Sequence, residues 1–135
     1  MKERTVQAEI QNIPGITAWV DEALEALDCP MKTQMQIDLA IDEMFANIAS
    51  YAYPSGTGSA TVRLDFDEAR REFSITFIDS GIPYNPLEKE DPDVTLSAEE
   101  REIGGLGIFL VRKTMDAMEY ARRDGHNVLT IRKKI

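Results

Sequence analysis

Hydrophobic positions recur at helical spacing in two segments near the start of the chain. In segment 16–27 the apolar residues return every three or four positions, and Asp28-Cys29-Pro30 then interrupts the pattern. Segment 32–53 is longer, and its apolar side chains share one face: Ile37, Ile41, Met44, Phe45, Ile48 and Ala52. These patterns predict two amphipathic helices, and a third is expected at 108–118.

Alternation of polar and apolar residues predicts strands elsewhere in the chain. Five segments show this alternation: 5–11, 60–66, 73–78, 119–122 and 128–131. Short polar connections, one of them Asp124-Gly125, indicate that the second and third segments form a hairpin and that the last two form another.

The expected order of elements is strand, helix, helix, strand, strand, loop, helix, strand, strand. Helices that cover one face of a mixed, mostly antiparallel sheet give an α+β fold, a two-layer α/β sandwich. The chain has 135 residues, with no internal repeat and no linker-like segment, so residues 1–135 are expected to form a single domain.

The segment from Asp79 to Ile103 shows little periodicity and contains Gly81, several acidic residues and three prolines. A loop of this length in a compact domain is usually functional or disordered. We therefore predict a lid over about 82–104. Within it, Ser97-Ala98-Glu99-Glu100 has the pattern of a capping box and predicts one short helical turn.

The charge balance limits the kinds of partner. With 24 acidic and 15 basic residues the net charge is -9, which disfavours general binding to nucleic acids or to anionic membranes. One cysteine excludes an internal disulfide, and one histidine excludes a multi-histidine metal site. No apolar run has the length of a signal peptide or a membrane span, so a cytoplasmic protein is expected. A polyanionic ligand would need a local site of backbone amides, a metal ion or a few placed cations.

Glu43 and Asn47 form the first candidate for a chemical site. Residues four apart on a helix point the same way, so this carboxylate and this amide lie together at the rim of the apolar face. A carboxylate can accept a proton, and an amide oxygen can ligate a hard cation such as Mg²⁺. A solvated glutamate and asparagine on an exposed face is the alternative.

Two glycine-containing motifs supply the other candidates. Asp79-Ser80-Gly81 ends a predicted strand, where the carboxylate can accept a hydrogen bond from an amino group of a ligand; an ordinary turn is the alternative. Gly104-Gly105-Leu106-Gly107 precedes a predicted helix, whose first amides can bind phosphate; the alternative is a flexible hinge. No Lys-Ser/Thr pair follows these glycines, which excludes a Walker A loop.

In this order, the three motifs resemble those of the GHKL (Bergerat-fold) ATPases, and the length favours the serine/threonine kinases that act as anti-sigma factors. Segment 42–47 is similar to the N box of that family. The resemblance implies that Glu43 is the general base, or orients the attacking hydroxyl, and that Asn47 ligates Mg²⁺ beside bound ATP.

The remaining site residues follow from the same resemblance. It implies that Asp79 binds the adenine amino group, that Gly81 leaves room for the base, and that Thr130 lies near adenine. Gly105-Leu106-Gly107 is similar to the second glycine box, whose amides would cradle the phosphates. Arg101, just before that box, is a candidate phosphate contact.

One position departs from the family pattern. The first glycine box usually has a second glycine where this chain has Pro83. A proline removes one amide donor and stiffens the start of the lid. The departure concerns the lid and the affinity for nucleotide rather than the placement of Asp79.

The family also implies partners. The expected activity is phosphorylation of a small anti-anti-sigma protein of the STAS fold, after which the kinase is free to hold a sigma factor, and a homodimer is possible. Two alternatives remain: a non-catalytic, ATP-responsive module that sequesters a partner, and a scaffold that binds no nucleotide. A retained Glu43 argues against the first, because nucleotide binding alone needs no base.

Overall fold

The computed structural model describes residues 2–88 and 105–135. Five strands form one sheet in the order β1-β2-β3-β5-β4, and every neighbouring pair is antiparallel. Their bounds are Lys2–Gln7 (β1), Ser59–Asp67 (β2), Glu72–Asp79 (β3), Ala117–Arg123 (β4) and His126–Lys134 (β5). The predicted α+β sandwich is confirmed, and among the described strands the sheet contains no parallel pair.

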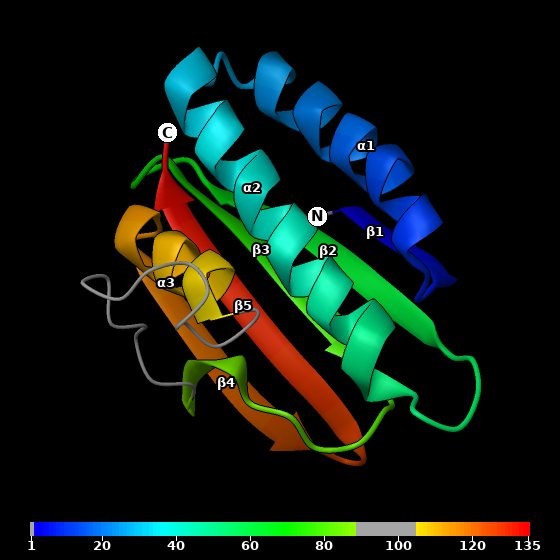
Figure 1. Cartoon of the computed structure of the whole chain (residues 1–135). Helices are drawn as coiled ribbons and strands as arrows, with labels where there is room; N and C mark the ends of the chain where they lie inside the picture. The colour runs from blue at the N-terminus through cyan, green and yellow to red at the C-terminus, as the bar shows by residue number, and fades with distance from the viewer. Residues whose placement is uncertain (1, 89–104) are drawn as a thin grey trace.

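Three helices cover one face of this sheet (Figure 1). They are α1 (Ile13–Ala26), α2 (Met31–Asn47) and α3 (Gly105–Thr114). Because two helices rather than one connect β1 to β2, the chain re-enters the sheet antiparallel to the strand that it left. Residues 89–104 of the predicted lid lie outside the described residues. The helical turn predicted at 97–100 falls entirely within that part of the chain.

The elements begin and end close to their predicted bounds, with three differences. The first strand is earlier in the chain than expected, and a short 3-10 turn (Ile10–Asn12) follows it. The second helix gives way to a π-helical turn (Ile48–Ala52) after Asn47. The third helix ends at Thr114, because Ala117 and Met118 pair with β5 instead. Periodicity alone could not separate an apolar helix end from an adjoining apolar strand start.

The core lies between the helices and the covered face of the sheet. Strand residues alternate between this face and the open face, as β3 shows with every second residue buried. The largest fully buried side chains are Phe45, Phe77, Ile16, Leu24, Ile37, Ile41, Met44, Ile75, Ile108, Ile131, Val20 and Val62. They hold α2 on the centre of the sheet, so its C-terminal end lies above the ends of the central strands.

A pair of carboxyl groups joins α1 to α2. Asp21 of α1 and Asp38 of α2 lie close enough for their carboxyl groups to share a proton, and Oδ1 of each is buried without another hydrogen-bond partner among the described residues. Burial, this shared proton and the nearby charges of Asp21, Asp42 and Glu25 raise the pKa of Asp38 to about 7. A raised pKa means that the folded state favours protonated Asp38.

We therefore expect the protein to become less stable as the pH rises through 7. The unfolded chain releases the Asp38 proton near its ordinary pKa of 3.8, so the stabilisation is complete below that pH and is lost as the pH passes the raised value. With allowance for the solvent exposure of the pair, the loss should be about 1 kcal/mol. Urea unfolding at pH 5.5 and at pH 8.5 measures it. Asp38→Asn keeps a hydrogen-bond donor at both pH values and should remove most of the difference; an equal difference in this variant would contradict the assignment.

Candidate functional site

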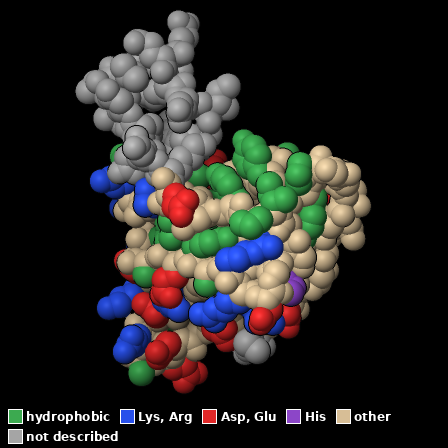
Figure 2. All heavy atoms as spheres, turned by 90° about the horizontal axis from the view of Figure 1, so that it is seen from below, with side chains coloured by type: hydrophobic (Ala, Val, Ile, Leu, Met, Phe, Trp, Pro, Cys, Tyr) green, Lys and Arg blue, Asp and Glu red, His purple; other side chains and the backbone are tan. Residues whose placement is uncertain are grey.

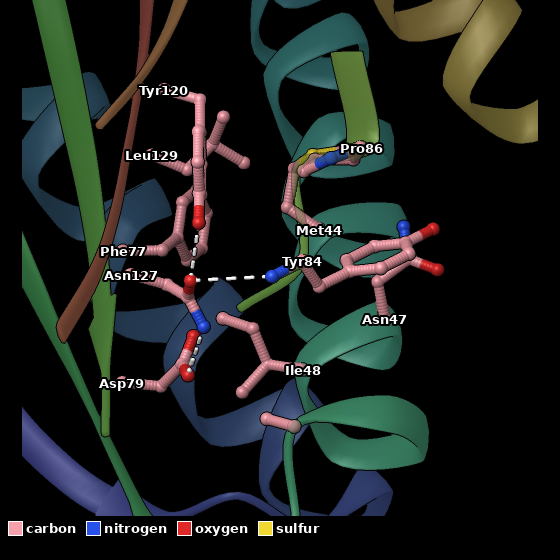
Figure 3. A pocket seen from close by; sticks show the side chains of 11 residues that line it. Met44, Asn47, Ile48, Phe77, Asp79, Tyr84, Pro86, Tyr120, Asn127 and Leu129 are labelled. Carbon is pink, nitrogen blue, oxygen red and sulfur yellow. Dashed lines mark hydrogen bonds between the residues drawn. The ribbon is translucent and has the colours of Figure 1, made fainter. Parts of the chain in front are cut away.

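A pocket opens between the C-terminal end of α2 and the ends of β3, β4 and β5. Segment 80–86, which we call the strap, crosses one side of it (Figure 3). The pocket contains about 380 Å³ of empty space, including solvent at its mouth. Its lining is mostly apolar: Met44, Asn47, Ile48, Ala52, Phe77, Asp79, Tyr84, Pro86, Tyr120, Asn127 and Leu129. A few polar groups in an apolar cleft are typical of a small-molecule site.

Asp79 is fixed at the sheet end of the pocket. It is the last residue of β3 and is only 5% exposed. Its Oδ1 accepts hydrogen bonds from the backbone N–H of Gly81 and from Nδ2 of Asn127, each at 2.9 Å. No other hydrogen bond to this side chain occurs within the described residues, so the second carboxylate oxygen remains for a ligand with an amino group.

Asn127 is a site residue that the motif analysis missed. It lies opposite Asp79 in the β3–β5 pairing and is 5% exposed. Its Nδ2 also donates to the carbonyl of Ile82 at 2.8 Å, and its Oδ1 accepts from the hydroxyl of Tyr120. Alternation offered a signal, because Asn127 shares its parity with the buried Leu129 and Ile131, whereas Thr130 has the opposite parity.

The same alternation corrects the placement of Thr130. Its hydroxyl pairs with that of Thr76 at 3.2 Å, and the two residues lie on the sheet face opposite to the buried side chains. Thr130 therefore does not reach the pocket. The expectation that Thr130 lies near the base rested on the family resemblance; in the structure Asn127 lines the pocket and Thr130 does not.

Asn47 supplies the polar group at the helix end of the pocket. Its Nδ2 is buried without a hydrogen-bond partner among the described residues. A buried amide left without a partner costs about 1–3 kcal/mol, which makes such a group a marker for a ligand. Its nitrogen can donate to a phosphate oxygen and its oxygen can ligate Mg²⁺, so the residue fits the role that the resemblance implies.

Glu43 lies one turn before Asn47 and contacts the first turn of α3. A β-carbon added to Gly107 would collide with the carboxylate carbon and both carboxylate oxygens of Glu43. The absence of a side chain at 107 thus lets the carboxylate approach the helix start. The structure brings the N-box carboxylate and the second glycine motif together, as the sequence predicts.

The strap packs closely against the π-helical turn. A β-carbon on Gly81 would collide with the carbonyl of Ala52, and the N–H of Ile82 donates to that carbonyl at 2.9 Å. The missing side chain of Gly81 therefore lets the strap approach the backbone of Ala52 closely. Gly105 is the first residue of α3. Arg101 lies outside the described residues, and the side chain of Leu106 is likewise not described.

The comparison with known families bears directly on this pocket. A family model for the histidine kinase-like ATPase domain matches residues 6–133. The chain belongs to the histidine kinase-like ATPase family. This membership confirms the resemblance seen in the motifs, and the family of an ATPase domain implies ATP as the ligand.

Three curated relatives of this ATPase domain carry kinase names. It is 35% identical over 100 residues to serine/threonine-protein kinase BtrW of Bordetella bronchiseptica. This alignment covers 74% of this chain and 70% of BtrW. It is 30% identical over 95 residues to serine-protein kinase RsbW of Bacillus mycoides and to that of Bacillus cereus. These two alignments cover 67% of this chain and 58% of each RsbW protein.

Two further findings limit the chemistry of the ATPase domain. Within residues 2–88 and 105–135, no group of three His, Cys, Asp or Glu side chains could hold a metal ion. A metal at Asn47 would therefore have few ligands from these residues, and water or nucleotide oxygens would complete its coordination. In the same residues, every helix is too short or too polar to cross a membrane.

Proposed function

We propose that the chain is an ATP-dependent serine/threonine protein kinase that acts as an anti-sigma factor. One observation carries the proposal: the carboxylate of Glu43 lies against Gly107 at the start of α3, one helical turn from Asn47 in the pocket. A site that only bound nucleotide would have no need of a carboxylate beside the phosphate-binding turn. The kinase names of the relatives support the same activity.

Each residue then has a distinct task in phosphate transfer. Asp79 accepts a hydrogen bond from the adenine amino group, and the first amides of α3 face the phosphates. Asn47 would hold Mg²⁺ together with those phosphates; the ion, when bound, would neutralise part of their charge. Glu43 accepts a hydrogen bond from the attacking serine or threonine hydroxyl, orients it and takes up its proton as the new O–P bond forms and ADP leaves.

The proposed phosphate acceptor is a STAS-domain anti-anti-sigma protein. Phosphorylation adds nearly two negative charges to that protein. Because this chain carries a net charge of -9, the added charge disfavours the complex and releases the kinase. The released kinase would then bind a sigma factor, with the exchange taking place in the cytoplasm.

A phosphate-transfer assay tests this proposal. The chain is mixed with γ-labelled ATP, Mg²⁺ and a STAS-domain anti-anti-sigma protein, and the label is followed on that protein. Transfer that requires the chain supports the kinase. If ATP binds while no label reaches the partner, the ATP-responsive binding module is the better description; if ATP does not bind at all, the scaffold is.

Gly107→Ala should separate catalysis from stability. The new methyl group would displace the Glu43 carboxylate, so we expect phosphate transfer to fall by about tenfold or more, within the range for a misplaced catalytic base. Thermal stability should stay the same or rise slightly, because alanine is favoured over glycine in a helix. The measurements are transfer rate and melting temperature.

The matched control is Gly15→Ala. Gly15 is the third residue of α1, as Gly107 is of α3, and a β-carbon there meets nothing within 4 Å. This variant should transfer phosphate at the wild-type rate. A Gly107→Ala protein as active as Gly15→Ala would show that the contact with Glu43 has no catalytic importance.

A further inference from the structure

Two tyrosine rings meet beside the pocket, and the motif analysis assigns a role to neither. Tyr51 lies in the π-helical turn after Asn47, and Tyr84 lies on the strap. Their ring centroids are 5.7 Å apart and their planes are inclined by 32°. Tyr51 is 47% exposed, whereas Tyr84 is half-buried and lines the pocket. The exposed ring of Tyr51 therefore packs against the ring of Tyr84 on the side away from the core.

Tyr84 extends from one end of the pocket toward the other. Its backbone N–H donates to Oδ1 of Asn127 at 3.4 Å, and the same asparagine holds Asp79. Its ring extends away from Asp79 toward α2, where Asn47 lies (Figure 3). Tyr84 thus lies between Asp79, which is proposed to bind the adenine base, and Asn47, which is proposed to lie near the phosphates.

The strap that carries Tyr84 is tied to both sides of the pocket. On the sheet side, Nη1 of Arg122 donates to the carbonyl of Gly81 at 2.8 Å. On the helix side, the N–H of Ile82 donates to the carbonyl of Ala52. With its backbone held in this way, the ring of Tyr84 depends for its position on its own rotamer and on Tyr51.

Hydrophobic side chains gather on this end of the molecule (Figure 2). Tyr51 and Ile82 are among the exposed hydrophobic residues, the latter at 49%. Burial, and then the neighbouring Tyr51, raise the pKa of the Tyr84 hydroxyl, so the side chain stays neutral. A neutral aromatic ring is suited to contact with a nucleoside rather than with a phosphate group.

We propose that Tyr84 contacts the adenosine portion of the bound nucleotide and that Tyr51 is a positioning residue for its ring. The inference rests on the proposed function, in which the base lies at Asp79 and the phosphates lie near Asn47. A ligand that reaches both groups passes along the ring of Tyr84. Contact with the ring buries apolar surface of the ligand and so increases its affinity.

The test compares dissociation constants for ATP and for AMP, measured by calorimetry. Tyr84→Ala should weaken the binding of both nucleotides by about tenfold, because the ring contacts the portion that they share. Tyr84→Phe should bind within about twofold of wild type, since it keeps the ring. Tyr84→Leu keeps a shorter apolar side chain without the ring, so it provides a second test if Tyr84→Ala does not fold, and it should also weaken the binding of both nucleotides.

Tyr51→Ala tests the positioning role. We expect about threefold weaker binding alone and no further loss when it is added to Tyr84→Ala, because Tyr51 acts through that ring. Additive losses would overturn the positioning role. Ile82→Ala is the matched control, since it removes an exposed apolar side chain from the same strap outside the pocket lining, and it should bind like wild type.

Two outcomes separate this inference from the proposed function. If the wild-type chain binds ATP and both Tyr84→Ala and Tyr84→Leu bind it equally well, the contact with adenosine is overturned while the kinase proposal stands. If the wild-type chain does not bind ATP at millimolar concentration, both proposals are overturned.

Discussion

Replacing Glu43 by glutamine should lower the rate of phosphate transfer to the acceptor protein by about 100-fold or more, the usual effect of losing a general base. Glutamine keeps the size and hydrogen-bonding reach of the side chain but cannot take up a proton at neutral pH. ATP affinity should stay within about threefold of wild type, because in the proposed site Glu43 contacts the hydroxyl rather than the nucleotide. Single-turnover transfer from labelled ATP measures the rate, and calorimetry measures the affinity.

A neighbouring carboxylate provides the control for this substitution. Asp42 is also on α2 but is exposed to solvent, so Asp42→Asn removes the same charge one residue away. It should leave the rate nearly unchanged. Equal rates for wild type and Glu43→Gln would mean that the carboxylate against Gly107 has only a packing role, and would favour the non-catalytic binding module.

Asp79→Asn should weaken the binding of ATP by about 10- to 100-fold. The substitution replaces a charged acceptor by an amide, and a hydrogen bond to a charged group contributes about 1.5–3 kcal/mol. The new oxygen can keep the bonds from Gly81 and Asn127, so the new NH₂ group lies on the ligand side. Two NH₂ groups then face each other, that of the side chain and that of adenine.

Inosine triphosphate makes this prediction specific to the base. It has a carbonyl in place of the adenine amino group, and the NH₂ of the asparagine can donate to that carbonyl. We therefore expect Asp79→Asn to lose affinity for ATP while it keeps or gains affinity for inosine triphosphate. An equal loss of affinity for both nucleotides, or no loss for either, would show that Asp79 does not hydrogen-bond to the base.

Much of the fold follows from short-range patterns. The alternation in 60–66 and 73–78 locates the central hairpin because both strands present one face to the core and the other to solvent. The apolar stripe of 32–53 locates α2, and Glu43 and Asn47 fall at its edge, as a spacing of four residues requires. Asp79 and Asn47 lie in one pocket, although they are 32 positions apart in the sequence, and their chemical roles remain predictions.

The features that could not be predicted depend on long-range register. Asn127 faces Asp79 only because β5 pairs with β3 in one particular register. The residues of segment 119–131 do not by themselves determine that register. The meeting of Tyr51 and Tyr84 likewise needs the strap to cross the π-helical turn. Local periodicity also does not predict a π-helical turn, because its apolar spacing resembles that of an α-helix over so few residues.

The two ends of the proposed nucleotide site are built from different parts of the fold. Asp79 and Asn127 belong to adjacent strands of the sheet, whereas Glu43 and Gly107 meet where two separate helices pack together. ATP and ADP differ only in the terminal phosphate, so the sheet end cannot distinguish them. In the proposed site, the loss of the terminal phosphate would therefore act at the contact between α2 and α3.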